Sequence, residues 1–215
     1  RSTGTKLISA CGNINKPGVY EIDMTISVEE FIYSDEYCGG IRDGHKLKAV
    51  VAGGSSVPIL SAENILTTEA GEKRLMTYES LSDGGFATGT MLGSGGFIVM
   101  DETTCIVHNT LTFTRFYHHE SCGQCSPCRE GTGWMDKVLH RIEHGQGRKE
   151  DIDLLVDVAK KIEGNTICPL GDAASWPVAA AIRHFRDEFE WHIEHPELAT
   201  KPGAVFMRKG ASWTK

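Results

Sequence analysis

The sequence predicts an α+β fold made of a strand-rich region, residues 1–100, followed by a helical region, residues 101–195. Short apolar runs separated by turn residues are typical of strands and hairpins, and they fill the first region. Apolar residues at helical spacing and four clustered cysteines mark the second region. Residues 196–215 contain Pro196, Pro202 and Gly203 and are expected to form a largely irregular tail.

The strand-rich region opens with a predicted β-hairpin. Its strands, Lys6–Ala10 and Val19–Ile22, flank an Asn-Lys-Pro-Gly turn. A short helix is expected at Ser27–Tyr33, because Ser27 is a favourable N-cap residue and Glu30 follows three residues later, as in a capping box.

Two further strands are expected in this region, at Leu47–Val51 and Phe97–Met100. Strand, strand, helix and strand in this order are consistent with a β-grasp domain. The intervening segment Ala62–Gly89 is polar and is expected to be irregular, with structure only near Tyr78–Leu81.

The helical region contains four stretches with apolar residues at helical spacing. They predict helices at Thr103–His119 and Arg129–Ile142, and further helices through Ile152–Ile162 and Val178–Phe189. Gly164 is a natural C-cap for the third helix. Four helices joined by cysteine-bearing loops predict a bundle that holds a metal site at one end.

The cysteines carry the chemistry of this region. Cys122, Cys125 and Cys128 have the spacing C-x2-C-x2-C, and Cys168 follows later, directly before Pro169. Ferredoxin-type sequences use this run with a Cys-Pro ending to bind a [4Fe–4S] cluster through four thiolates. The spacing therefore favours an iron–sulfur site and electron transfer. The three other cysteines are widely spaced and are expected to be ordinary buried residues: Cys11, Cys38 and Cys105.

Two other chemistries stay open from the spacing alone. Zinc also takes four cysteines, usually from two separate C-x2-C pairs, and would make the region a zinc-stabilised interaction module. Cys125 and Cys128 also form a C-x-x-C pair of the thiol–disulfide type, although no clear βαβ context surrounds them. His118 and His119 are expected not to be ligands, whereas Arg129 is the best candidate to tune the charge of the site.

Composition argues against several classes of function. The net charge of −7 provides no broad basic surface, so a nucleic-acid partner is not expected. The longest wholly apolar runs are short, such as Val178–Ile182, so no direct membrane span is expected. Most of the cysteines lie in one constellation, which indicates a reducing compartment rather than a secreted disulfide scaffold.

The segments around the cysteines resemble a known family. ESCGQCSPCREGTGW, IEGNTICPLGDAASWPV and the N-terminal GTKLISACGNINKPGVYEI closely resemble the NADH- and FMN-binding flavoprotein subunits of respiratory complex I. The resemblance covers nearly the whole chain. It implies an SLBB domain of β-grasp (ubiquitin-like) fold followed by a four-helix bundle. It also implies that one [4Fe–4S] cluster is ligated by Cys122, Cys125, Cys128 and Cys168.

The resemblance implies an electron-transfer role in an NADH:quinone oxidoreductase. In the family, NADH reduces FMN, and the [4Fe–4S] cluster passes electrons to the next iron–sulfur subunit toward quinone. The implied partners are other peripheral-arm subunits, of the E type with a [2Fe–2S] cluster and of the G type with several clusters. The implied location is cytoplasmic, peripheral on the inner face of the bacterial cell membrane. The equivalent subunit of an NAD-linked hydrogenase or formate dehydrogenase shares the local motifs.

The family's NADH and FMN sites lie mainly in a larger N-terminal α/β domain. We expect this chain to be a C-terminal fragment that lacks that domain, carries no catalytic residue and is inactive with NADH alone. Its contact with FMN is left unassigned. The glycine runs Gly53–Gly54 and Gly93–Gly96 do not fit the strand-to-helix order of a dinucleotide fingerprint and are predicted to be tight turns.

Overall fold

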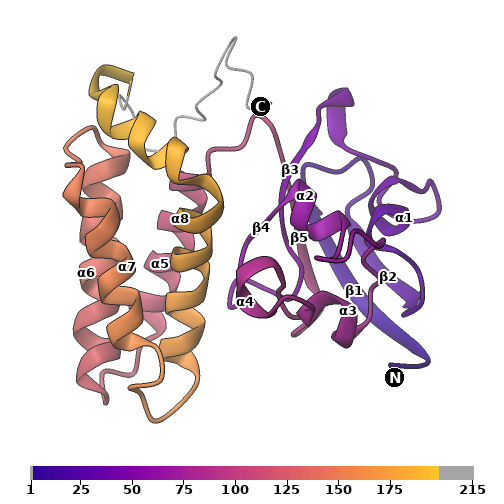
Figure 1. The fold of residues 1–215 in the computed structure, drawn as a ribbon, viewed down its shortest axis with the longest axis horizontal. Helices are drawn as coiled ribbons and strands as arrows, with labels where there is room; N and C mark the ends of the chain where they lie inside the picture. Colours follow the sequence, from indigo (N-terminus) through magenta and orange to yellow (C-terminus); the bar gives the residue numbers. More distant parts are fainter. Residues whose placement is uncertain (1, 199–215) are drawn as a thin grey trace. The chain divides into compact units, whose positions relative to one another are not determined.

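The computed structural model describes residues 2–198, which divide into two compact units, residues 2–104 and residues 105–198. The first unit contains a sheet with short helices, and the second contains long helices (Figure 1). Each unit buries its own set of apolar side chains. The chain therefore mixes strands and helices in the order that the sequence predicts.

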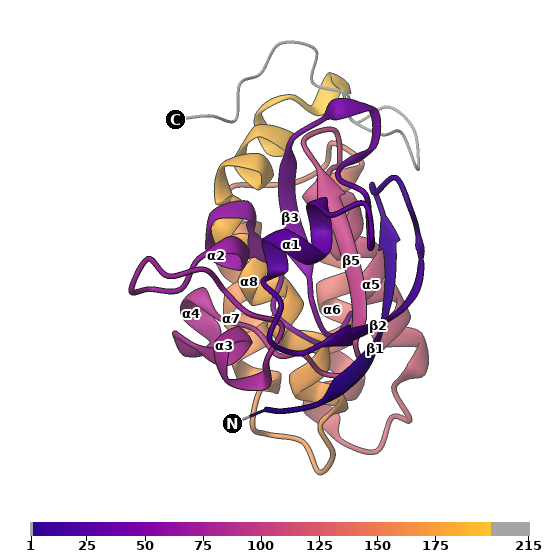
Figure 2. The same cartoon turned by 90° about the vertical axis from the view of Figure 1, so that its right-hand side faces the viewer.

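The sheet of the first unit has five strands within residues 2–104, in the order β2-β1-β5-β3-β4. They are β1 (Thr5–Gly12), β2 (Gly18–Asp23), β3 (Leu47–Val51), β4 (Leu60–Ser61) and β5 (Gly96–Asp101), with a 3₁₀ turn, η1 (Arg42–Gly44), before β3. β1 pairs antiparallel with β2, which confirms the predicted hairpin. β5 runs parallel to β1 and antiparallel to β3, so it forms the middle of the sheet (Figure 2).

Helix α1 (Val28–Tyr33) lies across one face of this sheet (Figure 2). The Ser27 hydroxyl accepts a hydrogen bond from the Glu30 amide at 3.0 Å, which confirms Ser27 as the N-cap. Phe31 is fully buried, and its ring lies edge-on to Phe97 of β5 with 5.2 Å between the ring centroids. This aromatic contact fixes the helix to the central strand.

The strand period places Cys11 on the outer side of the sheet. Ile8 and Ala10 of β1 are buried, so the residue that follows them faces the opposite side. Cys11 is exposed, and the expectation that it is buried is wrong. Cys38 and Cys105 are buried as expected, and burial raises the pKa of the Cys38 thiol to about 12.

The two glycine runs form turns that pack backbone against backbone. Ser94 N donates to Gly53 O at 3.2 Å, and Gly54 N donates to Gly96 O at 2.7 Å. A Cβ atom on Gly53 would lie 2.3 Å from Met91 O, so only glycine permits this approach. The predicted tight turns are confirmed.

The polar segment before β5 contains three short helices, not the irregular chain that we expected. They are α2 (Ala62–Leu66), α3 (Tyr78–Ser82) and α4 (Gly85–Thr88), of which α3 confirms the structure predicted near Tyr78. The other two, α2 and α4, have only five and four residues, too few for apolar residues to recur at helical spacing.

Arg74 is the centre of this segment. Its side chain is fully buried, and its hydrogen bonds reach main-chain carbonyl oxygens. Nε donates to Asn64 O at 2.9 Å, and Nη2 donates to Thr67 O at 3.2 Å and to Thr88 O at 3.1 Å. Nη1 donates to Ser80 O. Burial lowers the pKa of Arg74, because it disfavours the charged form of the side chain. The hydrogen bonds to carbonyl oxygens offset the free-energy cost of burying this charge.

Replacing Arg74 by methionine should lower the unfolding free energy of the first unit by about 3–5 kcal/mol, because several buried carbonyl groups lose their donor. Arg42→Met is the matched control, since Arg42 has a half-exposed side chain and should change stability by less than about 0.5 kcal/mol. Hydrogen exchange of residues 2–104 in increasing urea measures both effects. Equal stability of the two variants would contradict the role of Arg74.

Four α-helices form the second unit within residues 105–198. They are α5 (Ile106–Glu120), α6 (Ser126–Glu143), α7 (Glu150–Ile162) and α8 (Leu170–Glu194), followed by a 3₁₀ turn, η2 (Pro196–Leu198). Consecutive helices are in contact, and α8 also contacts α5 and α6 (Figure 1). The rest of the predicted tail, residues 199–215, lies outside the described residues. Within residues 2–198, every helix is too short or too polar to cross a membrane.

An ion pair joins α6 to α7. The Asp151 carboxylate is buried and accepts a hydrogen bond from Arg141 Nε at 2.6 Å and another from the Arg148 amide at 2.9 Å. Burial alone would raise the pKa of Asp151, but the bonds from Arg141 and Arg148 hold it below its usual value. A carboxylate in the first turn of α7 also suits the positive end of the helix.

Because the pKa of Asp151 is lowered in the folded state, its stabilising effect is present above its unfolded value of about 3.9 and is lost as the pH falls through the folded value. Asp151→Asn should lower the unfolding free energy by about 2–3 kcal/mol at neutral pH. Below about pH 4, the unfolding free energy of the variant should fall less steeply with decreasing pH than that of the wild type. Urea unfolding followed by tryptophan fluorescence reports mainly this unit, which contains three of the four tryptophans of the chain, Trp134, Trp176 and Trp191. Parallel pH profiles for the two proteins would contradict the assignment.

Candidate iron–sulfur cluster site

The four predicted ligands come from two connections between helices. Cys122 and Cys125 lie between α5 and α6, and Cys128 lies in the first turn of α6. Cys168 lies between α7 and α8. Both connections are at the same end of the helices, the lower end in Figure 1.

A direct hydrogen bond joins the two connections. The main-chain N–H of Ile167 donates to Cys125 Sγ at 3.3 Å. Ile167 precedes Cys168, so this bond brings the fourth cysteine to the other three. The Thr166 hydroxyl donates to Cys168 O at 2.9 Å and closes the turn that carries the fourth cysteine.

Cys128 is the most buried of the four cysteines, with 7% of its surface exposed. Its Sγ lies 3.2 Å from the Ser121 hydroxyl, which also accepts a hydrogen bond from the Gly123 amide at 3.3 Å. Ser121 thus links the C-terminal end of α5 to a sulfur atom on α6. The sequence alone did not reveal this role.

Arg129 acts on the cysteine loop. Its Nη1 donates to Gly123 O at 2.7 Å, and its Nη2 lies 3.4 Å from the Ser126 hydroxyl. Gly123 has φ +77°, a conformation that favours glycine. The predicted cation is therefore placed within the loop, where it holds the main chain and adds positive charge; Glu130 offsets part of that charge at 2.9 Å.

The helices α6 and α8 both start at the cysteines. Cys125 is the N-cap of α6 and Pro169 is the N-cap of α8, and within residues 105–198 neither helix has a side-chain cap. Asp172, in the first turn of α8, does not cap the helix, and its carboxylate accepts a hydrogen bond from Gly164 N at 2.7 Å. The first-turn amides of both helices therefore remain available to an anionic group.

The neighbouring histidines contact acidic residues. His118 Nδ1 lies 3.5 Å from the Asp136 carboxylate, and His119 Nδ1 lies 2.9 Å from Glu120 on the surface. That neither histidine is a ligand stays a prediction. One side of the site is open, because Cys122 and Cys168 are exposed and Ile167 has 86% of its surface exposed.

These residues fit a [4Fe–4S] cluster. Four thiols come from two adjacent connections, an amide already donates to one sulfur, and a hydroxyl lies against another. Hydrogen bonds to sulfur and positive helix ends are the features that stabilise an anionic cluster. Zinc is less well matched, because structural zinc sites draw their cysteines from two pairs rather than from three and one.

Two family models match the chain, one to each unit. The SLBB domain matches residues 6–98, and the NADH-ubiquinone oxidoreductase-F iron-sulfur binding region matches residues 108–192. The fold and the site thus define an SLBB domain joined to an iron–sulfur binding region.

Curated relatives identify the family. The F subunit of NADH-quinone oxidoreductase from Rickettsia bellii is 46% identical over 90% of this chain, and the F 1 subunit of the Rhizobium meliloti enzyme is 46% identical over 94%. The chain belongs to the family of NADH-quinone oxidoreductase F subunits. It spans 44% of the length of these two relatives.

Solved structures share the fold. The chain superposes on NAD+-reducing [NiFe]-hydrogenase in the H2-reduced state with a TM-score of 0.71, at 26% identity, over 95% of this chain and 31% of the hydrogenase chain. The air-oxidised state of an NAD+-reducing [NiFe]-hydrogenase gives a TM-score of 0.71 at 27% identity, over 88% of this chain and 30% of the other.

Cys168→Ala should reduce bound iron from about four to about three atoms per chain or fewer, because the fourth corner of the cluster loses its ligand. Hydrogen exchange should increase in residues 105–198 and stay unchanged in residues 2–104, since metal binding couples to the folding of its ligands. Cys38→Ala, at a buried cysteine of the other unit, is the control and should keep about four iron atoms. A full iron complement in Cys168→Ala would refute the ligand assignment.

Proposed function

We propose that this chain is the electron-transfer part of an NADH dehydrogenase flavoprotein subunit and binds one [4Fe–4S] cluster through Cys122, Cys125, Cys128 and Cys168. The observation that carries the proposal is the bond from Ile167 N–H to Cys125 Sγ, which brings the lone cysteine to the group of three. The match of residues 108–192 to an iron–sulfur binding region supports it.

The chain's own residues perform three tasks at this site. The cysteine loop and the turn before α8 hold the sulfur atoms, and Arg129 fixes the loop through Gly123 O. The Ile167 amide, the Ser121 hydroxyl and the starts of α6 and α8 supply positive potential where negative charge accumulates. Burial of Cys128 shields one side of the site from water. When bound, a [4Fe–4S] cluster supplies acceptance and release of single electrons.

We further propose which electron donor, electron acceptor and partner subunits this site has in the whole protein. Electrons reach the chain from FMN that NADH has reduced, both bound mainly outside this chain, and leave to the next iron–sulfur subunit toward quinone. The partners are the E-type [2Fe–2S] and G-type multi-cluster subunits of the complex I peripheral arm, on the inner face of a bacterial cell membrane. The exposed residues Cys122, Ile167 and Cys168 suit the exit, because an electron donor must approach its acceptor closely.

Finer features of the fold belong to the same proposal. The strand order β2-β1-β5-β3-β4 with α1 across the sheet supports a β-grasp (ubiquitin-like) fold for the SLBB domain. The contacts that join α5 to α6, α6 to α7, α7 to α8 and α8 back to α5 support a four-helix bundle. The boundaries that we propose remain residues 1–100, 101–195 and 196–215.

A second candidate is the equivalent subunit of an NAD-linked hydrogenase. The similarity to NAD+-reducing [NiFe]-hydrogenase structures favours it, at 26–27% identity. The respiratory assignment is preferred because the quinone-linked relatives are 46% identical. Purification of the full-length protein with its natural partners distinguishes the two, since co-purification of a nickel-containing subunit would exclude the respiratory assignment.

NADH should not bleach the visible absorbance of the anaerobically reconstituted chain, whereas dithionite should bleach it and produce an electron paramagnetic resonance signal. The reason is that this chain binds the proposed [4Fe–4S] cluster, but its glycine runs do not fit the dinucleotide-binding fingerprint that a site for NADH would use. A colourless preparation, or one that keeps its absorbance in dithionite, would contradict the electron-transfer proposal. Reduction by NADH in the absence of other flavoproteins would contradict the fragment's expected inactivity.

A further inference from the structure

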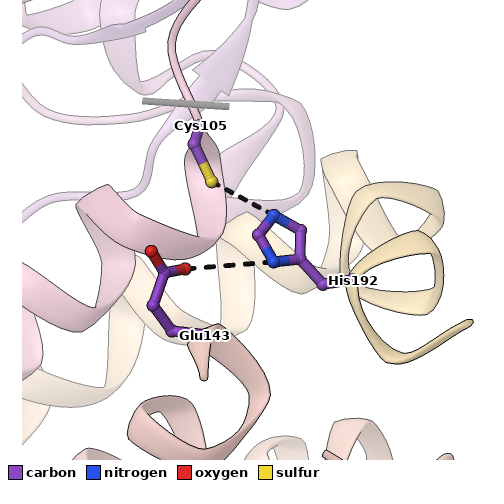
Figure 3. A group of neighbouring side chains, drawn as sticks. All are labelled: Cys105, Glu143 and His192. Atoms are coloured by element: carbon purple, nitrogen blue, oxygen red, sulfur yellow. Dashed lines mark hydrogen bonds and ion pairs between the residues drawn. The ribbon is translucent and has the colours of Figure 1, made fainter. Parts of the chain in front are cut away.

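A second cluster of metal-binding side chains lies at the other end of the helical unit. Cys105 is the N-cap of α5, Glu143 is the last residue of α6, and His192 lies near the end of α8 (Figure 3). The start of α5 and the ends of α6 and α8 are opposite the iron–sulfur site. From Cys128 to Glu143, α6 rises by about 22 Å, so the two places are separate.

The three side chains converge in the interior. Cys105, Glu143 and His192 have only 4%, 5% and 1% of their surfaces exposed. Cys105 Sγ lies 3.3 Å from His192 Nε2, and His192 Nδ1 lies 3.9 Å from Glu143 Oε2 (Figure 3). One donor atom from each side chain can be chosen so that all three lie within 4.8 Å of one another.

The surroundings of Glu143 point to a cation. Both of its ion-pair partners among the described residues are histidines, His108 and His192. Glu143 Oε2 is buried and accepts no hydrogen bond within residues 2–198. A second buried carboxylate, Glu188, belongs to the same end of the unit, and its Oε1 accepts a hydrogen bond from Ile106 N at 2.9 Å. Buried acids of this kind are normally paired or coordinate a metal ion.

We propose that Cys105, His192 and Glu143 bind a zinc ion. Thiolate, imidazole and carboxylate are the three zinc donors in proteins, at bond lengths of about 2.0–2.3 Å. A tetrahedral ion separates its donors by about 3–4 Å, so the side chains need to close by only about 1 Å. His108 Nδ1 lies 3.0 Å from Glu143 Oε1, which leaves Oε2 for the metal and orients the carboxylate, as partners of metal ligands commonly do.

The site has a structural task. It joins the start of α5 to the ends of α6 and α8, at the end of the unit where the iron–sulfur cluster makes no link. Zinc bound there stabilises the folded state by the free energy of its binding. A fourth position remains for a water molecule or a second carboxylate oxygen.

The test uses the whole chain after anaerobic iron–sulfur reconstitution, so that the four cluster cysteines are occupied. The chain is equilibrated with Zn²⁺, washed, and analysed for zinc by mass spectrometry and by X-ray absorption at the zinc edge. We expect about one zinc ion per chain, surrounded by one sulfur and otherwise by nitrogen and oxygen. Glu143→Gln, which keeps the shape of the side chain, and Cys105→Ser should each weaken zinc binding by at least about 100-fold.

Two controls are matched to these variants. Cys38→Ser removes a buried cysteine from the other unit, and Glu163→Gln removes a carboxylate near the opposite end of the helices. Both should bind zinc as the wild type does. The proposal would be overturned if the wild type bound no zinc, or if Glu143→Gln and Cys105→Ser bound zinc as tightly as the wild type. Zinc surrounded by four sulfur atoms would overturn it too. That last result would also remove the iron–sulfur assignment, whereas an iron-loaded chain without zinc would leave it intact.

Discussion

The structure depends on the meeting of two connections that are distant in the sequence. Three cysteines come from the loop before α6 and its first turn, one comes from the turn before α8, and a cluster forms only if the two segments lie together. The helices α5, α6, α7 and α8 run in alternating directions, which places both segments at one end (Figure 1). The hydrogen bond from the Ile167 amide to Cys125 Sγ then holds the two segments together. Helix packing and the ligand set therefore depend on each other.

Charge distribution explains why this end suits an electron carrier. The helices α6 and α8 begin at the cysteines without side-chain caps, and Arg129 holds the cysteine loop. Positive potential is thus concentrated where thiolates and added electrons carry negative charge. The opposite end has the reverse character, since the buried acids Glu143 and Glu188 lie there with histidines. The two ends of the helical unit are consequently suited to different metal chemistry.

The sequence revealed the features that are local. The hairpin, the Ser27 cap and the glycine after α7 all depend on neighbouring residues, and the structure has them. The sequence did not predict the features that are built from residues distant in the chain. Arg74 is an arginine in a polar segment, and only tertiary hydrogen bonds show that it organises three short helices. Cys105, predicted to be ordinary core packing, meets two side chains from distant helices.

The central claim is that the four cysteines bind one [4Fe–4S] cluster. A Mössbauer spectrum of the wild-type chain reconstituted with ⁵⁷Fe tests this claim most directly. The account predicts that the bound iron behaves as one population of paired, mixed-valence, sulfur-coordinated atoms, about four per chain. Iron that appears as isolated high-spin ions with nitrogen or oxygen ligands would contradict it. So would a reconstituted chain that retains no iron while its helices remain folded.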